Sequence, residues 1–459
     1  MKRLLFVLLF AAHPAIAVAQ QPFVTDSTVR AIVDERVRTK RAMGVVVSVL
    51  ERGSPARTFT AGISGVSGLS LDGNTVFEIG SITKAFTGAL LADMVARGEV
   101  KLDDPISKYL PKTVRVPSRN GRQITLLDLA TQSSGLPRLP DNLKPADASN
   151  PYADYSVAQL YDFLSRYTLT RDPGEKYEYS NLGVGLLGHV LALRAGKSYE
   201  DLLVERILEP LGMHDTRITL TTSMKSRMAQ GFDAQGTPAH TWDLPTLAGA
   251  GALKSTANDM LKFLAANLDS TSVPLGKVLA QARVSRHDAD RPGNSVGLGW
   301  HLVDVYGTPA TWHNGGTGGF RTFIGMDEAR HRGVIVLTNS TNTPDDIGFH
   351  ILEPKVALAA PPEPAKQRKE IALDSTKLQP LVGVYQLAPN FQVAVTREGA
   401  SLFIQATDQP KFPIFAESEL EFFLKVVDAQ FSFIRDANGQ VNQLVLHQGG
   451  ANIAGLRVK

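Results

Sequence analysis

The stretch FEIGSITKAF, residues 77–86, places Ser81 and Lys84 three positions apart in an otherwise apolar segment. If a helix begins at Ser81, the two side chains share one face, so the amine can reach the hydroxyl. Burial beside Ile79 and Phe86 would disfavour the charged lysine and lower its pKa, and a neutral amine can accept a serine proton. Backbone N–H groups at the start of a helix favour a nearby developing anion. The stretch predicts a nucleophile with its base; a surface serine cap beside a solvated lysine is the alternative.

The segments around this stretch predict a sheet built from both ends of one domain. β-branched, strand-like segments precede it at residues 44–50 and 56–63 and return at 297–305, 320–326 and 333–339. Helical patterns fill the middle, at residues 81–96, 157–167, 181–194 and 199–207. Because hairpin links cannot build a parallel sheet, we expect an α/β (α+β) fold with an antiparallel sheet, flanking helices and an inserted all-helical region beside a cleft.

A second domain is expected near the C-terminus. The proline-rich and basic run at residues 357–370 is typical of a linker and separates a first domain at 20–356 from residues 371–459. Short alternating segments follow it, with turn signals at Gly399 and Asn438-Gly439. This pattern predicts a small all-β barrel or sandwich.

The N-terminal residues 1–19 have the pattern of a cleaved secretory signal: two basic residues, an apolar run and a small-residue cleavage site before Gln20. A membrane anchor is the weaker interpretation because His13 and Pro14 interrupt a run that is already short. We therefore expect a periplasmic or secreted protein without a stable membrane anchor after cleavage. The chain has no cysteine, which excludes disulfides and thiolate metal sites, and its formal charge of +3 gives no reason to expect nucleic-acid binding.

Two further clusters are candidates for chemistry. Tyr179 and Asn181 lie where a helix is expected to begin. The phenol could transfer a proton if neighbouring cations lower its pKa, and the amide can pair with an ester or amide substrate. The alternative is that Asn181 caps the helix and the tyrosine packs in the core.

The other cluster, WHNGGTGGF, places His313, Gly315 and Gly316 just before an expected strand. Glycines there let a substrate lie along the backbone, although a bulged turn and an ordinary polar histidine would give the same letters. The chain has no nucleophile elbow, zinc helix, phosphate loop or dinucleotide fingerprint, so no metal and no cofactor are expected.

Taken in order, Ser-x-x-Lys, Tyr-x-Asn and a polar triplet ending in glycine resemble the active-site plan of the serine β-lactamase and penicillin-binding-protein superfamily. The sequence around these motifs is similar to that of the class C β-lactamase-related branch over about residues 30–350. The resemblance implies that Ser81 is acylated and that Lys84 and Tyr179 transfer protons. It further implies substrate contacts and an oxyanion hole. The implied contacts are Asn181, His313, Gly315 and Gly316 for the substrate, and the backbone N–H groups of Ser81 and Gly316 for the oxyanion.

Two departures shape the expected activity. The triplet is His313-Asn314-Gly315 where related β-lactamases usually have Lys-Thr-Gly, so the cation that would hold a β-lactam carboxylate becomes a mostly neutral group. Arg138 and Leu139 replace a glutamine that contacts the antibiotic in many class C enzymes. Both point to the esterase and D-amino-acid peptidase branch.

The predicted function is therefore an exported serine hydrolase acting on small esters, amides or D-amino-acid peptides, with slow β-lactam hydrolysis alongside. A true class C β-lactamase and a non-catalytic penicillin-binding-like sensor or binding protein are the alternatives. The partner is a small-molecule or short-peptide substrate, with no prediction for oligomeric state. In this superfamily a lipocalin-like module sometimes follows the hydrolase domain. The expected C-terminal barrel resembles such a module.

Overall fold

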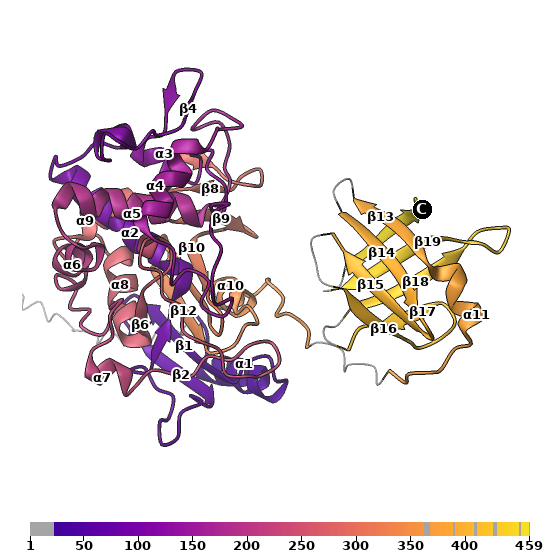
Figure 1. Cartoon of the computed structure of the whole chain (residues 1–459). Coiled ribbons are helices and arrows are strands. Elements are labelled where there is room, and N and C mark those ends of the chain that lie inside the picture. The colour runs from indigo at the N-terminus through magenta and orange to yellow at the C-terminus, as the bar shows by residue number, and fades with distance from the viewer. Residues whose placement is uncertain are drawn as a thin grey trace, which may run out of the picture. The chain divides into compact units, whose positions relative to one another are not determined.

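The computed structural model describes residues 23–361, 368–388, 391–407, 411–425, 429–448 and 451–458. The predicted signal segment, residues 1–19, lies outside these ranges. The chain divides into two compact units, residues 1–361 and 362–459, which are described separately (Figure 1).

The first unit is built on an eight-stranded sheet in the order β2-β1-β12-β11-β10-β9-β8-β7, with antiparallel neighbours throughout. The N-terminal strands pair with the last one, which confirms the predicted antiparallel sheet made from both ends of the domain. Its strands are β1 (Gly44–Glu51), β2 (Arg57–Gly62), β7 (His287–Asp288), β8 (Ser295–Val296), β9 (His301–Val305), β10 (Thr308–Gly316), β11 (Arg321–Asp327) and β12 (Arg332–Thr338).

Alternating side chains of the central strands enter two different cores. On β1, Val45 and Val47 pack with α1 (Asp26–Arg38) and α10 (Asp345–Leu352) on one face of the sheet. Val46 belongs to the larger core on the opposite face, where α8 (Ala257–Leu268) contacts the sheet (Figure 1). Both faces of the strand are therefore buried, which explains its continuous run of valines.

The helical region lies between the two halves of the sheet in sequence. Its helices are α2 (Thr83–Ala96), α3 (Leu126–Ala130), α4 (Val157–Arg166), α5 (Asn181–Ala195), α6 (Tyr199–Leu203), α7 (Thr222–Lys225) and α9 (Gly276–Ala282). Short 3₁₀ turns are η1 (Gly80–Ile82), η2 (Ile106–Lys108) and η4 (Ala248–Ala250), and a π-turn, η3 (Val204–Leu208), continues α6. Two small antiparallel ladders complete the unit. One pairs β3 (Val76–Glu78) with β6 (Lys254–Thr256), and the other pairs β4 (Ser118–Arg119) with β5 (Arg122–Gln123).

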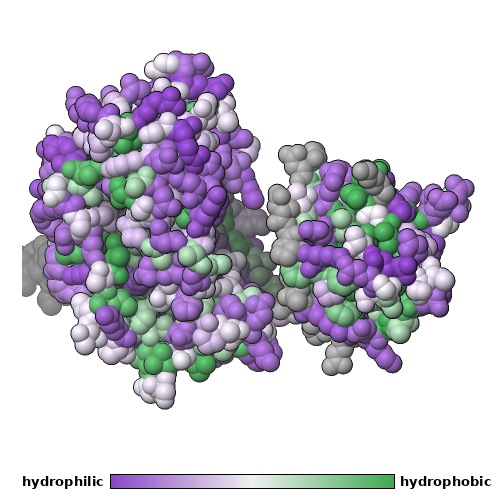
Figure 2. All heavy atoms as spheres, viewed as in Figure 1, coloured by the Kyte–Doolittle hydropathy of each residue, from purple (hydrophilic) through white to green (hydrophobic). Residues whose placement is uncertain are grey.

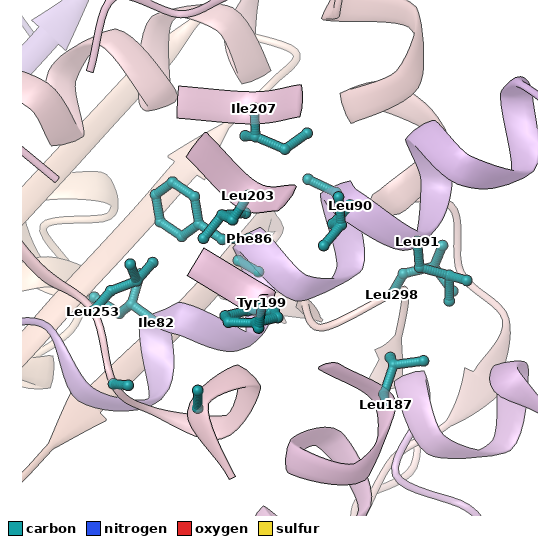
Figure 3. Packing of buried hydrophobic residues seen from close by; sticks show 14 of the residues in the cluster. Ile82, Phe86, Leu90, Leu91, Leu187, Tyr199, Leu203, Ile207, Leu253 and Leu298 are labelled. Atoms are coloured by element: carbon teal, nitrogen blue, oxygen red, sulfur yellow. The ribbon is translucent and has the colours of Figure 1, made fainter. Parts of the chain in front are cut away.

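Helix α2 is buried almost all round, as expected of a helix that is apolar on every face. Figure 3 shows Phe86 and Leu90 of α2 among side chains from the helices that surround it, including Tyr199 and Leu203 of α6. Glycines follow the ends of two helices, with Gly98 at φ +71° after α2 and Gly196 at φ +64° after α5. A helix this firmly packed holds its first turn in a fixed place.

The longest strand of the first unit, β10, was not expected from the sequence. The run that contains His313, Gly315 and Gly316 was predicted to lie just before a strand, whereas it lies inside β10. The residues His313 to Gly316 include an asparagine and two glycines, which have little β-propensity, so the pairing with β9 and β11 decides the conformation. The predicted helix at 199–207 also ends earlier, since α6 gives way to a π-turn after Leu203.

The second unit is a closed eight-stranded antiparallel barrel, so the predicted barrel or sandwich is a barrel. Its strands are β13 (Gly383–Ala388), β14 (Phe391–Glu398), β15 (Ser401–Ala406), β16 (Phe412–Ala416), β17 (Glu421–Phe423), β18 (Ala429–Arg435), β19 (Val441–Gln448) and β20 (Ala451–Arg457), preceded by α11 (Ser375–Leu378) and the 3₁₀ turn η5 (Gln379–Leu381). Alternation on β18 is regular, with Phe431 and Phe433 in the core. Pro413 lies inside β16 and interrupts the alternating pattern of that strand.

The visible face of the first unit is covered mainly by hydrophilic residues, with apolar ones in small separate patches (Figure 2). Within the described part of the chain, no helix is both long enough and apolar enough to cross a bilayer.

Candidate active site

Ser81 lies in the 3₁₀ turn η1, between β3 and the first turn of α2. Gly80 has φ +51°, a conformation that glycine adopts without strain, and a Cβ placed on it would lie 2.6 Å from the backbone nitrogen of Gly316. The Thr83 hydroxyl closes the turn by donating to the Gly80 carbonyl at 2.7 Å. Ser81 is thereby held half-buried at the N-terminal end of a rigid helix.

Lys84 is completely buried and its amine has three polar neighbours. Nζ lies 2.9 Å from Oδ1 of Asn181, 2.6 Å from the carbonyl oxygen of Ala250 and 3.0 Å from Oγ of Ser81. The amide and carbonyl oxygens can only accept, so they use two N–H groups. Burial, and secondly the charge of Arg138, hold the pKa of Lys84 well below its usual range. In the neutral amine the third position is a lone pair that faces the Ser81 hydroxyl, which is the arrangement needed to take its proton.

The Tyr179 ring lies over this amine, with Nζ of Lys84 4.8 Å from the ring centroid and Cζ of Arg138 5.0 Å from it. The condition considered from the sequence, that neighbouring cations lower the pKa of Tyr179, is not met. Burial raises the pKa of Tyr179 to about 12, and the hydrogen bond with Ser81 and the charge of Arg138 offset that only in part. At neutral pH the phenol therefore keeps its proton and is able to donate it.

Asn181 is the first residue of α5 but does not cap it, contrary to the alternative considered from the sequence. The cap is Ser180, whose hydroxyl accepts from the Gly183 N–H at 2.8 Å. The Asn181 side chain is therefore free to bridge: its Oδ1 accepts from Lys84 and its Nδ2 donates to the Tyr152 hydroxyl at 3.3 Å.

The glycines of β10 allow the strand to touch the turn that holds Ser81. A Cβ on Gly315 would lie 1.9 Å from the Ile79 carbonyl oxygen, so no larger residue fits there without displacing backbone. Gly316 follows and its nitrogen lies against Gly80. The structure thus brings the backbone of Gly316 beside Ser81.

His313 lies behind the site and not at its surface. It is 1% exposed, its Nδ1 bonds the Asn314 carbonyl at 2.6 Å, and its Nε2 is buried without a hydrogen-bond partner. Since the carbonyl requires a proton on Nδ1, Nε2 presents a lone pair. Burial, then the charges of His301 and Lys84, hold the pKa of His313 well below 6.5, so it is neutral through the physiological range. Its ring centroid lies 6.3 Å from that of Tyr179.

A cavity of about 610 Å³ opens over these groups. It is lined by Ser81, Arg138, Tyr152, Tyr179, Asn181, Trp242, His301, Asn314, Gly315, Gly316, Thr317, Arg321, Thr343 and Asp345. His313 and Leu139 are absent from this lining, whereas Tyr152, Trp242, His301, Arg321 and Asp345 were not singled out from the sequence. His301 could not have been found by spacing, because β9 brings it to Tyr177, whose hydroxyl lies 2.9 Å from its Nε2. Arg321 had a weak signal, as the residue directly after the glycine-rich run.

Comparisons with known proteins agree on the family. The family model described as Beta-lactamase matches residues 29–352, and that of a domain of unknown function, DUF3471, matches residues 367–455. The chain is 33% identical over 303 residues to the D-alanyl-D-alanine-carboxypeptidase/endopeptidase AmpH of Escherichia coli (strain K12), covering 61% of this chain and 76% of that protein. It is 27% identical over 350 residues to a beta-lactamase of Pseudomonas fluorescens, covering 69% and 92%.

Solved structures show the same fold for the first unit. A beta-lactamase/D-alanine carboxypeptidase from Yersinia pestis, complexed with citrate, superposes with a TM-score of 0.62 at 25% identity, covering 72% of this chain and 99% of that one. A second, from Pseudomonas syringae, gives 0.61 at 21% identity, covering 71% and 96%. The chain therefore belongs to the beta-lactamase family and is a serine hydrolase of its beta-lactamase and DD-carboxypeptidase group, not the non-catalytic binding protein considered as an alternative.

Proposed function

We propose that the protein hydrolyses small esters, amides and D-amino-acid peptides through an acyl-enzyme on Ser81, and β-lactams more slowly. The supporting observation is the Lys84 amine, whose two N–H groups are taken by carbonyl oxygens and whose remaining position lies 3.0 Å from the Ser81 hydroxyl. The carboxypeptidase name of the Escherichia coli relative is the reason to include D-amino-acid peptides among the substrates.

In the first step Lys84 accepts the Ser81 proton while Oγ attacks the carbonyl carbon. The oxyanion of the tetrahedral intermediate is held by the backbone N–H groups of Ser81 and Gly316, each worth roughly 3 kcal/mol in such sites. Collapse breaks the bond to the leaving group, which takes the phenolic proton of Tyr179. The Lys84 ammonium then returns its extra proton to the phenolate, so that both groups are restored. Water repeats the sequence on the ester to release the acid.

The neutral His313 supports the esterase and peptidase branch over a dedicated class C β-lactamase. A buried imidazole with a lone pair offers no charge to a β-lactam carboxylate, unlike the lysine usual in that enzyme class. We expect efficient turnover of p-nitrophenyl esters or D-alanyl peptides and slow turnover of nitrocefin. Fast nitrocefin hydrolysis with poor ester turnover would favour the class C alternative instead.

Active-site labelling tests the proposal directly. The purified full chain is incubated with a fluorophosphonate or with penicillin, digested and analysed by mass spectrometry. One adduct is expected on the peptide that contains Ser81, and none in the variant Ser81→Ala. An unmodified wild-type protein, or an adduct on another residue, would contradict the proposal.

We also propose export with removal of residues 1–19, a linker over 357–370 and a lipocalin-like barrel over 371–459. The support is the signal pattern of the first residues and the proline-rich run between the units. Expression in a Gram-negative host should give a periplasmic protein whose N-terminal sequence starts at Gln20. An uncleaved chain retained in the cytoplasm would refute export.

A further inference from the structure

Arg321, the first residue of β11, lies against the strand that carries Gly316. Its Nη1 donates to the carbonyl oxygens of Thr317 at 2.6 Å and Phe320 at 2.8 Å, which fixes the guanidinium. A Cβ built on Gly316 would lie 3.1 Å from Cζ, Nε and Nη1 of Arg321, so the guanidinium lies directly beside the Gly316 backbone. A fixed cation therefore stands next to one of the two proposed oxyanion donors.

The rest of this guanidinium has no hydrogen-bond partner in the described residues, although the charge of Asp345 acts on it. Nε and Nη2 make no hydrogen bond to them, and none of their carboxylates lies within ion-pair distance of Arg321. The side chain is half-buried, and burial lowers the arginine pKa from its usual value. A guanidinium has five donors in a planar fork, and here the free edge of that fork borders the cavity over Ser81.

The other charges of the cavity leave it net positive. Arg138 also lines it, without a side-chain hydrogen bond to the described residues. Asp345 supplies the one carboxylate among the described lining residues. Its Oδ2 accepts from Nδ2 of Asn314 at 2.6 Å and burial raises its pKa, which reduces its ability to neutralise the arginines. Two guanidinium groups against one carboxylate favour an anionic substrate.

We propose that Arg321 is a specificity-determining residue that binds a free carboxylate of the substrate, close to the bond that Ser81 attacks. The planar fork fits a carboxylate in two parallel hydrogen bonds, which the buried and neutral His313 cannot provide. The inference rests on the proposed acyl-enzyme function and names its preferred substrates: peptides that end in a free carboxylate, over the same peptides with an amidated or esterified end. The carboxylate site is thus displaced from the triplet on β10 to the first residue of β11.

The test compares an acid with its amide. N-acetyl-D-alanine and N-acetyl-D-alaninamide are titrated calorimetrically into the full-length protein, since binding needs no reaction at Ser81. The acid should bind at least about tenfold more tightly, as expected for loss of a charge-assisted pair in the amide. Arg321→Gln should remove this preference and leave amide binding within about twofold. Arg291→Gln, which removes an exposed guanidinium outside the cavity lining, should keep it.

Equal binding of acid and amide to the wild-type protein would overturn the proposal, as would an unchanged ratio in Arg321→Gln. If Arg321→Gln does not fold, Arg321→Lys is the variant to measure, because it keeps the charge but loses the planar fork of donors. Its affinity for the acid should fall severalfold while its affinity for the amide stays the same. An unchanged ratio of the two affinities would refute the inference. Labelling of Ser81 by a neutral fluorophosphonate separates the two claims. Absent labelling with intact acid preference contradicts the proposed chemistry, whereas normal labelling without acid preference contradicts only the role of Arg321.

Discussion

Both units of the chain contain a serine hydroxyl bonded to a basic group. In the first unit Nζ of Lys84 lies 3.0 Å from Ser81, and on the barrel Nε2 of His447 lies 2.7 Å from Oγ of Ser432. The pair on the barrel has a third member, because Nδ1 of His447 lies within hydrogen-bond distance, 2.6 Å, of Oδ1 of Asn452. Lys84 likewise bonds Asn181 at 2.9 Å, so hydrogen bonding alone does not distinguish the two serines.

The surroundings differ. Lys84 is wholly buried beneath a cavity, next to backbone N–H groups that a developing oxyanion needs. Ser432 and His447 are half-exposed on the face of the barrel opposite to its core, and Ser432 also donates to the exposed Glu421 at 2.7 Å. A hydrogen bond to a base does not make a nucleophile. Desolvation of the base and prearranged donors do, and only the first unit combines them among the described residues.

Replacing each serine by alanine should give the largest difference in activity between the two hydrogen-bonded pairs. Ser81→Ala should lower turnover of a D-alanyl peptide or a p-nitrophenyl ester by about 10⁴-fold or more, because no nucleophile remains. Ser432→Ala is the matched control and should leave kcat/KM within about twofold. Comparable losses in both variants, measured by steady-state kinetics, would show that the barrel takes part in catalysis.

Replacing the bases should give the next largest difference. Lys84→Met removes the proton acceptor and should lower the acylation rate by about 10³-fold, whereas His447→Ala should have little effect. Stopped-flow acylation with a chromogenic ester measures both. An acylation rate in Lys84→Met within tenfold of the wild type would rule out Lys84 as the base.

The pH dependence of the wild-type acylation follows from the same burial. Only the neutral amine accepts a proton, so the rate should rise with pH as Lys84 deprotonates. Because the folded-state pKa is lowered, the rise should end at a plateau well below the ordinary lysine range. Tyr179 has a pKa raised to about 12 and should add no falling limb below about pH 11. A rate still rising through pH 10 would conflict with this assignment.

A smaller and more selective effect is expected for Tyr179→Phe. The phenol is proposed to protonate the leaving group, so hydrolysis of a D-alanyl amide should fall by about 10²-fold. A p-nitrophenol leaving group needs no such proton, so the corresponding ester should lose much less. The ratio of the two kcat/KM values measures the role, and equal losses for both substrates would contradict it.

Replacing a glycine by alanine should lower the free energy of unfolding by different amounts in the two units. Gly315→Ala forces a Cβ against the Ile79 carbonyl and should cost about 3 kcal/mol, with loss of activity as β10 moves from Ser81. Gly439→Ala, at φ +79° with open space around it, should cost about 1 kcal/mol. The three tryptophans, Trp242, Trp300 and Trp312, all lie in the first unit, so their fluorescence in urea reports its unfolding. A Gly315→Ala protein as stable as the wild type would disprove the close contact.

The sequence predicted what local patterns encode. Ser81 and Lys84 lie one turn apart in a buried segment, and strands such as β1 and β12 show their β-branched runs. It did not predict β10 as a strand, because its glycines are selected by contact with η1 and not by propensity. Arg321 at the cavity depends on long-range packing in the same way. Ser180 as the cap of α5 is a local feature, and the expectation at this position was Asn181. The sequence suggested only that neighbouring cations could lower the pKa of Tyr179, because nearby charges can be inferred from sequence and the burial that raises this pKa cannot.

The account depends on an uncharged Lys84 facing Ser81, and NMR of protein labelled with ¹³Cε-lysine measures that charge state directly. The resonance missing from Lys84→Met identifies the residue. Its titration midpoint should lie well below the usual 10.5, with the amine neutral where the enzyme is active. A midpoint near that usual value would mean a permanent ammonium beside Ser81 and would contradict the proposed chemistry.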